Sequence, residues 1–349
     1  MKISVLSLWR DSMKHIHRTF SQLESLEARH PDIDFSYFFY ENDSVDGTKK
    51  TLLEWLENRD GKLLSQKLNV RKWGSVNSPK RMAQMAIYRN NLLHFSRPLE
   101  SDYTLVFDSD IIFEPDLIES FLANAKSCNN WALLSANTRQ NIACLLDEKI
   151  EDSYYDVACL LDSRKIPVAT WWDCPFFASG DREKWYSGEP IKVTSAFGSC
   201  SLIKTDALNN LKVKWSSVNG MVEHVGLCFS IKEHHGGDIY VCPNTKARVW
   251  HKFGLGGDGS QVPWDRELEE LTNKHSKEIL ELSDWEQLQK YQSIGNKNGL
   301  ISSLSAEPIV EYISLHEKVA EAKGIEKDPR NESIFSFSEF EEKESEDCK

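Results

Sequence analysis

The amino-acid sequence predicts an α/β fold in which a mostly parallel sheet is flanked by helices. Short apolar segments alternate with helical segments through the first half of the chain, as in parallel strands joined by crossover helices. The length of 349 residues suits one large α/β domain with an extension, or two small domains. A composition of 40% hydrophobic and 28% charged residues is that of a globular protein.

The elements of the first half follow from local patterns. The segment 35–40 is rich in aromatic residues, as strands commonly are. Leu52, Leu53 and Leu56 share one face of a helix, and Pro79 stands near the start of a long run of helix formers. The expected strands are 2–8, 35–40, 103–107 and 131–135, and the expected helices are 12–29, 48–58, 79–95 and 115–126.

The second half of the chain has a weaker pattern. Residues 140–192 lose a clear period. Beyond them we expect strands at 193–203, 239–241 and 247–251, a helix at 223–233 and a glycine-rich loop at 254–259. The polar residues 264–325 have a helical pattern, and the acidic, serine-rich end from residue 326 has the composition of a disordered segment.

Charge, cysteines and hydropathy limit the class of protein. A formal net charge of −12 argues against nucleic acid or an anionic membrane as the main partner, although a metal ion and local basic residues can still hold a phosphate-bearing ligand. The 8 cysteines form no CxxC pair, which favours reduced thiols over a zinc site or a disulfide scaffold. Arg10 and Asp11 interrupt the first apolar run, so we expect a soluble, cytoplasmic protein with no signal peptide and no transmembrane segment.

Asp108, Ser109 and Asp110 directly follow the apolar strand 103–107. Carboxylates that leave a buried strand lie at the carboxyl edge of the sheet, where α/β proteins bind ligands. Two acids so close repel each other unless a cation lies beside them, and hard oxygen ligands suit Mg²⁺ or Mn²⁺. Such an ion can bridge a diphosphate. A solvated acidic turn is the alternative interpretation.

A second polar segment, residues 40–48, follows the second expected strand. Glu41 and Asp43 are expected at the same sheet edge as Asp108, where they can accept hydrogen bonds from a base or a ribose. Residues 46–48 fit a tight turn and a helix start, so a capping turn explains that part of the segment equally well.

These segments, with Tyr88-Arg89-Asn90 on the helix between them, resemble the GT-A glycosyltransferases, which have a Rossmann-like fold. The likeness covers residues 1–255 and is closest to proteins resembling the cryptococcal capsule-associated mannosyltransferases. It implies transfer of a sugar from a UDP- or GDP-sugar donor to a glycan or other hydroxyl acceptor, with Mn²⁺ or Mg²⁺ as cofactor. It also implies the residues that bind the donor, namely Ser7, Trp9, Arg10, Glu41, Asp43, Arg89, Asp108, Ser109 and Gly198.

The same resemblance implies catalytic and metal-binding residues. Glu223 and His224 stand where the family has its x-Glu-Asp motif at a helix start. The second acid of that motif is commonly the base, so His224 is a departure, and either residue is a candidate base. His251 matches a histidine that often completes the metal site with Asp110, while Asp108 bonds ribose or reaches the metal through water. Helix capping and ordinary structural roles are the alternatives.

An aromatic cluster suggests an acceptor site. Trp171 and Trp172 can stack on pyranose faces and Asp173 can bond sugar hydroxyls, although such clusters are equally ordinary in a core. Asp156, in a Tyr-Tyr-Asp segment similar to one near the donor sugar in these enzymes, joins the expected acceptor set. Gly198 lies in a loop where glycine permits close backbone approach, and a plain bulge is its alternative interpretation.

Three other classes of protein compete with this hypothesis. A haloacid dehalogenase-like phosphatase also places Asp-x-Asp after an apolar strand, but on its first strand and with Thr or Val where this chain has Ile112. A nucleotidyltransferase needs a glycine-rich, basic triphosphate loop near the first strand, and the sequence has none. A degenerate fold that only binds sugar is opposed by the intact candidate residues, Asp108, Asp110, Glu223 and His251.

The expected domain organisation follows from these features. A GT-A catalytic domain spans 1–260, with a nucleotide-binding half at 1–135 and an acceptor-binding half at 136–260. A helical extension is expected at 261–325, and an acidic, disordered tail at 326–349.

Overall fold

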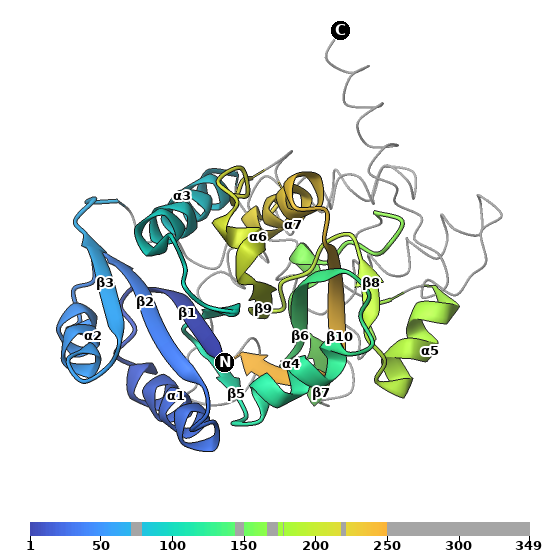
Figure 1. The fold of residues 1–349 in the computed structure, drawn as a ribbon, viewed down its shortest axis with the longest axis horizontal. Helices are drawn as coiled ribbons and strands as arrows, with labels where there is room; N and C mark the ends of the chain where they lie inside the picture. The colour runs from blue at the N-terminus through green and yellow to red at the C-terminus, as the bar shows by residue number, and fades with distance from the viewer. Residues whose placement is uncertain (71–78, 144–149, 166–173, 177, 218–220, 250–349) are drawn as a thin grey trace, which may run out of the picture.

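A computed structural model describes residues 1–70, 79–143, 150–165, 174–176, 178–217 and 221–249, which form a mixed α/β domain around a 10-stranded sheet (Figure 1). The strands are β1 (Lys2–Trp9), β2 (Asp34–Asn42), β3 (Gly61–Gln66), β4 (Tyr103–Asp108), β5 (Ile111–Phe113), β6 (Trp131–Ala143), β7 (Ile150–Tyr154), β8 (Ile191–Val193), β9 (Cys200–Lys204) and β10 (Asp238–Val249). They are paired in the order β3-β2-β1-β4-β9-β6-β10-β5, with β7 added to β6 and β8 added to β10.

The first four strands of this order are all parallel. Their carboxyl ends therefore meet at one edge of the sheet. Trp9 at the end of β1 is paired with Glu41 of β2, and its neighbour Leu8 is paired with Asp108 of β4. The two acidic segments of the sequence thus lie on either side of β1, as the strand–helix alternation predicted.

The second half of the sheet contains the antiparallel strands. β9 runs antiparallel to both β4 and β6, and β10 runs parallel to β6. Strands β1, β2, β3, β4, β6 and β10 therefore share one direction, which confirms the expected mostly parallel sheet flanked by helices. Because β9 is reversed, its first residue, Cys200, lies opposite Phe107 at the same edge as the acidic segments.

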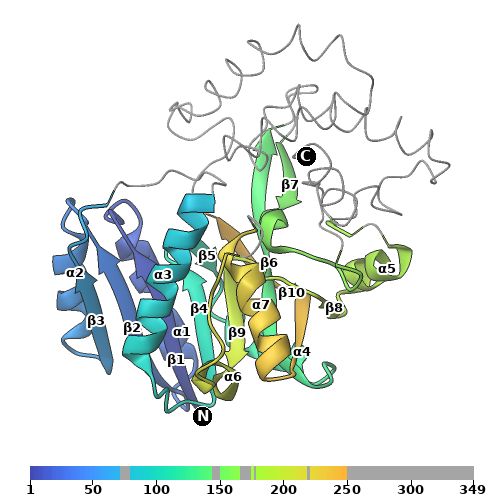
Figure 2. The ribbon, with the colours of Figure 1, turned by 90° about the horizontal axis from the view of Figure 1, so that it is seen from above.

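Helices cover both faces of the sheet (Figures 1 and 2). They are α1 (Ile16–Arg29), α2 (Thr48–Leu56), α3 (Pro79–Ser96), α4 (Leu117–Ala125), α5 (Ser179–Ser187), α6 (Thr205–Asn209) and α7 (Glu223–His234), with a 3₁₀ turn, η1, at Val157–Cys159. Side chains of α1, α2 and α4 build one apolar core, and those of α3, α6 and α7 build the other. In α1, the residues Ile16, Phe20 and Leu23 are buried at the spacing of one helical face.

Several elements differ from the sequence prediction for local physical reasons. β3, β5, β7, α5 and α6 were not predicted; β3 has no fully buried residue, and its pairing with β2 makes it a strand. The single strand expected at 193–203 is two strands, β8 and β9, separated by a segment in which Gly198 has a φ of +62°. The strands expected at 239–241 and 247–251 are one strand, β10, with an irregularity between Cys242 and Lys246.

The predicted helical extension at 261–325 and the acidic tail at 326–349 lie outside the described residues. In the described part of the chain, no helix combines the length and the apolar character needed to cross a bilayer. The cytoplasmic location stays a prediction.

Asp238, the first residue of β10, offers a test of how β10 is held to β8 and α7. Its carboxylate accepts hydrogen bonds from Lys192 of β8 at 2.8 Å and from Lys232 of α7 at 2.5 Å. Burial acts to raise the pKa of Asp238, but these two lysines outweigh it, so the pKa lies below its ordinary value. A lowered carboxyl pKa adds stability above the unfolded-state pKa, and that stability is lost as the pH falls through the folded-state pKa.

We therefore expect Asp238→Asn to lower the free energy of unfolding by about 1 kcal/mol at pH 7, a small value because both lysines are more than half exposed. Urea unfolding at pH 7 and below roughly pH 4 measures it. The difference between variant and wild type should shrink at the lower pH. A difference that stays constant, or grows in acid, would contradict this account of Asp238.

Candidate active site

The Asp108–Asp110 segment leaves β4 at the carboxyl edge of the sheet and is fixed from two sides. The Asp108 backbone N–H donates to the Ser199 carbonyl at 2.8 Å. From α1, the Thr19 hydroxyl donates to the Ser109 carbonyl at 2.9 Å. The three residues of the segment are partly exposed, so its carboxylates lie at the surface of the sheet edge rather than in the core.

Arg89 of α3 joins two of the predicted site residues. Its guanidinium is buried, and its Nη2 donates to Asp108 Oδ1 at 2.9 Å while its Nε donates to Glu223 Oε1 at 3.0 Å. Burial acts to lower the pKa of Arg89, but the charges of Asp108 and Glu223 outweigh burial and raise it. One buried cation therefore binds an acid from the end of β4 and an acid from the start of α7, two segments that are far apart in the sequence.

Asp108 is the more open partner of this network. Its side chain is 32% exposed, whereas that of Glu223 is 5% exposed. The pKa of Asp108 lies above its ordinary value. Loss of solvent around the carboxyl group and the charge of Asp110 raise this pKa, and the charge of Arg89 acts to lower it. The repulsion between Asp108 and Asp110 that the sequence predicted is thus present, and Arg89 offsets part of it.

Glu223 and His224 are both buried at the N-terminus of α7. Glu223 Oε1 accepts the hydrogen bond from Arg89, and among the described residues Glu223 Oε2 has no hydrogen-bond partner. A carboxylate in the first turn of a helix is favoured by the helix dipole. Glu223 therefore has one oxygen fixed by a cation, while its other oxygen keeps its lone pairs free of hydrogen bonds in the described part of the chain.

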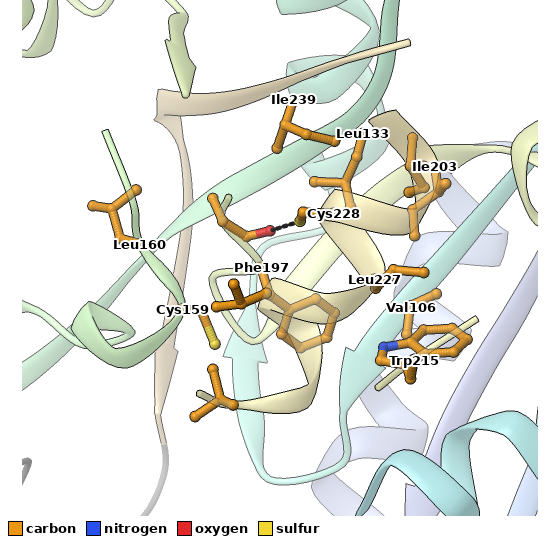
Figure 3. Close-up of a cluster of buried hydrophobic side chains, with 14 of the residues drawn as sticks. Val106, Leu133, Cys159, Leu160, Phe197, Ile203, Trp215, Leu227, Cys228 and Ile239 are labelled. Atoms are coloured by element: carbon orange, nitrogen blue, oxygen red, sulfur yellow. Dashed lines mark hydrogen bonds between the residues drawn. The ribbon is translucent and has the colours of Figure 1, made fainter. Parts of the chain in front are cut away.

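The His224 imidazole is held between aromatic side chains. It is stacked on Phe197, with ring centroids 3.4 Å apart, and its Nδ1 accepts a hydrogen bond from Trp215 Nε1 at 3.2 Å. Phe197 and Trp215 belong to the buried cluster that also contains Leu227 and Cys228 of α7 (Figure 3). Burial, and then the charges of Arg89 and Arg81, lower the pKa of His224 well below its ordinary value. The imidazole is therefore neutral at physiological pH.

Asp156 lies next to this network, between β7 and η1. Its Oδ2 accepts a hydrogen bond from the Ser199 N–H at 3.4 Å. The pKa of Asp156 is raised to about 6, mainly by burial; a hydrogen bond with the Cys159 thiol acts to lower this pKa, and the charge of Asp108 acts to raise it. Burial and the charges of Asp110, Asp156 and Asp108 also raise the pKa of Tyr155 well above its ordinary value. The Tyr155 phenol therefore stays protonated beside three carboxyl groups.

Gly198 approaches the backbone of β6 closely. Its carbonyl accepts a hydrogen bond from the Thr138 hydroxyl, and its φ of +62° is in the left-handed region. A Cβ atom at this position would collide with the Ala136 carbonyl and the Ser135 hydroxyl. Glycine is thus required at this position for the contact with β6. The predicted contact between Gly198 and the donor sugar stays a prediction.

Gly198→Ala should therefore lower the free energy of unfolding by at least about 2 kcal/mol, because it combines left-handed strain with a backbone clash. Gly180→Ala is the matched control, since a Cβ there meets nothing within 4 Å in helix α5. Urea unfolding of both variants measures the effect. Equal stability of the two variants would show that the 195–199 loop relaxes around the added methyl group.

The predicted nucleoside-binding residues at the end of β2 hold a loop. Glu41 accepts hydrogen bonds from the Ser44 N–H at 2.8 Å and the Ser65 hydroxyl at 2.7 Å. Asp43 accepts the backbone N–H groups of residues 68–70 at 2.8 to 3.2 Å. The Arg10 Nη2 donates to the carbonyl of residue 70 at 2.9 Å. Asp43 and Arg10 therefore fix the chain that follows β3, while Glu41 links the loop after β2 to β3 itself. The carboxylates retain lone pairs for a ligand.

Ser7 and Trp9 lie in β1 with their side chains inside the domain. The Ser7 hydroxyl donates to the Phe107 carbonyl at 2.9 Å. Trp9 is 1% exposed, packs on Phe20 and Phe39, and has no hydrogen-bond partner for its Nε1 among the described residues. The donor-binding role of these two residues stays a prediction.

Other predicted residues lie outside the described ranges. They are the acceptor candidates Trp171, Trp172 and Asp173 and the metal-ligand candidate His251. In the described part of the chain, no group of three or more His, Cys, Asp or Glu side chains is arranged to hold a metal ion. Asp108 and Asp110 nevertheless fit Mn²⁺ or Mg²⁺ chemically, because both are partly exposed carboxylates at one sheet edge with hard oxygen donors.

Four residues that shape this site were not predicted from the sequence. Trp215 and Thr19 have no distinguishing pattern, and Phe197 directly precedes the predicted Gly198. Asn90 directly follows the predicted Arg89, and this adjacency is the one signal that could have indicated it. Asn90 Nδ2 donates to the Trp215 carbonyl at 2.7 Å, and the Trp215 N–H donates to Asn90 Oδ1 at 2.9 Å.

Comparison with known proteins gives structural matches only. No family model matches the chain, and no curated protein sequence matches it. The crystal structure of S. aureus TarS 1-349 in complex with UDP-GlcNAc matches at 14% identity and a TM-score of 0.43, covering 92% of this chain and 81% of that chain. The mannosyltransferase PcManGT from Pyrobaculum calidifontis, in complex with GDP-Man and Mn²⁺, matches at 13% identity and a TM-score of 0.43, covering 92% and 75%. At these TM-scores the matches establish neither family nor function, and the cryptococcal resemblance stays a prediction.

Proposed function

We propose that this protein is a metal-dependent glycosyltransferase of the GT-A type that moves a sugar from a UDP- or GDP-sugar to a hydroxyl acceptor. The observation that carries the proposal is Arg89, which binds Asp108 and Glu223 with one buried guanidinium. A donor-side carboxylate and a candidate base are thereby held next to each other at the carboxyl edge of the sheet, where α/β proteins bind ligands. Such an arrangement is what a displacement between donor and acceptor requires.

The donor side of the site consists of Asp108 and Asp110, with His251 as the predicted further ligand. Together these residues would hold Mn²⁺ or Mg²⁺, which supplies neutralisation of the charge that develops on the leaving diphosphate. Arg89 fixes Oδ1 of Asp108, which limits rotation of that carboxylate. Thr19 and Ser199 hold the backbone of the segment, so that its acids need little reorganisation when a donor binds.

The acceptor side is assigned to Glu223 rather than to His224. Nδ1 of His224 already accepts a hydrogen bond from Trp215, whereas Oε2 of Glu223 has no partner among the described residues. Glu223 would take the proton of the acceptor hydroxyl while the acceptor oxygen bonds to the anomeric carbon. The bond from that carbon to the leaving nucleoside diphosphate breaks in the same displacement, which inverts the anomeric configuration.

A thermal-shift screen of UDP- and GDP-sugars with and without Mn²⁺ tests the proposal. A donor at about 100 times its dissociation constant adds roughly 2.7 kcal/mol of stability. The sugar that stabilises the protein should then be released from its nucleotide when Mn²⁺ is present. Sugar binding without turnover would support a degenerate binding protein, and phosphate release from simple phosphomonoesters would support a phosphatase; either result would overturn the proposal.

A further inference from the structure

Two adjacent residues of α3 hold two adjacent residues of α7. Arg89 binds Glu223 directly, while Asn90 reaches His224 through Trp215. The Asn90 side chain forms two hydrogen bonds with the Trp215 backbone, one to the carbonyl at 2.7 Å and one from the N–H at 2.9 Å. This paired bonding fixes the position of the Trp215 backbone relative to α3.

Trp215 in turn determines which nitrogen of His224 carries the proton. The indole Nε1–H is a donor only, and it lies 3.2 Å from Nδ1 of His224. Nδ1 must therefore be the acceptor nitrogen, and a neutral imidazole then has its proton on Nε2. Both side chains are buried, so water does not compete for Nδ1.

The position of Nε2 means that this tautomer acts on the carboxylate of Glu223. Nε2 of His224 faces Oε1 of Glu223 at 3.6 Å, and Oε1 is also the oxygen that Arg89 binds. A proton on Nε2 presents positive charge to that oxygen. The other tautomer would turn a nitrogen lone pair toward it and repel it. The stack on Phe197, with centroids 3.4 Å apart and planes at 10°, fixes the plane of the ring, and the hydrogen bond from Trp215 fixes which side of the ring carries Nδ1.

We propose that His224 is a positioning residue. Asn90 and Trp215 hold it in the tautomer with its proton on Nε2, and this proton keeps Oε1 of Glu223 in place. Oε2 of Glu223 is then positioned to take the proton of the sugar acceptor's hydroxyl group. The inference rests on the proposed function. It adds the Asn90–Trp215–His224 chain to the site and gives a role to the residue that departs from the family's Glu-Asp motif.

The tautomer is measured without any substrate. In the full-length protein labelled with ¹⁵N-histidine, the signal of His224 is identified among the 10 histidines by its absence in His224→Gln. We expect an unprotonated Nδ1 and a protonated Nε2 in the wild type, and a mixture of the two tautomers in Trp215→Phe. A wild-type His224 with its proton on Nδ1, or one that exchanges between tautomers, overturns the proposal whether or not the protein transfers sugar.

The positioning role is measured by kinetics. Trp215→Phe and His224→Asn should each lower kcat on the order of 10- to 100-fold, because the base is displaced, with the KM for the donor unchanged. His224→Gln should retain most of kcat, since a glutamine amide can present an N–H near the place of Nε2, whereas asparagine reaches only to the place of Nδ1. Equal kcat losses for Gln and Asn, or a normal kcat in both, overturn the positioning role.

Trp55→Phe is the matched control for loss of an indole hydrogen bond. Trp55 lies on helix α2, on the opposite face of the sheet, and its Nε1 donates to Oε1 of Glu24 on helix α1 at 3.0 Å. This variant should leave both the His224 tautomer and kcat unchanged. If Trp55→Phe lowers kcat as much as Trp215→Phe does, the kinetic effect reflects general loss of stability and the positioning role is overturned.

Discussion

Glu223→Gln should lower kcat for sugar transfer by a factor on the order of 10² to 10⁴ while donor binding is retained. Glutamine has nearly the size of glutamate, and its amide oxygen can still accept the hydrogen bond that Arg89 Nε now donates to Glu223 at 3.0 Å. It cannot take a proton at neutral pH, so the acceptor hydroxyl would have no base. Initial rates at saturating donor and acceptor, with the donor affinity from a thermal shift, separate chemistry from binding.

Glu233→Gln is the control for this substitution, because Glu233 lies at the far end of the same helix with its side chain 74% exposed. It should change neither kcat nor donor affinity. His224→Asn should be milder than Glu223→Gln. The opposite ranking would move the base to His224, and a normal rate in both variants with retention of the donor's anomeric configuration would favour a front-face mechanism without a protein base.

Asp110→Ala should abolish transfer and remove the stabilisation by Mn²⁺, while leaving the fold intact. Asp110 is partly exposed at the sheet edge, so its loss leaves no cavity in the core. Transfer depends on it because the metal would lose a carboxylate ligand beside the leaving diphosphate. A melting curve with and without Mn²⁺, followed by donor hydrolysis, measures both effects.

Asp116→Ala is the matched control, since Asp116 is an exposed acid shortly after Asp110 with no side-chain hydrogen bond to its helix. It should leave activity and the response to Mn²⁺ unchanged. If Asp110→Ala stays active, or if removal of divalent metal with EDTA leaves the wild type active, the metal assignment is wrong.

Residues of the candidate site could be predicted from the sequence only where they directly follow a recognisable strand. Asp108 follows an apolar run directly, so a buried strand and the edge of a sheet were enough to place it. Glu41 and Asp43 were also placed at that edge, but the bond of Glu41 to Ser65 in β3 and those of Asp43 to the loop after β3 were not expected. β3 is partly buried and weakly patterned, and a loop that follows an unpredicted strand cannot be assigned partners in advance.

The α/β class and the common edge of the acidic segments could be predicted from the sequence, because the period of apolar residues and the alternation of strands with helices are local patterns. The bond between Arg89 and Glu223, which lie 134 positions apart in the chain, is visible only in the folded molecule. The same holds for the hydrogen bond that Trp215, which no motif distinguishes, donates to Nδ1 of His224. Contacts of this kind depend on how α3 and α7 pack side by side on the sheet, and hydrophobic packing over that distance leaves no period in the sequence.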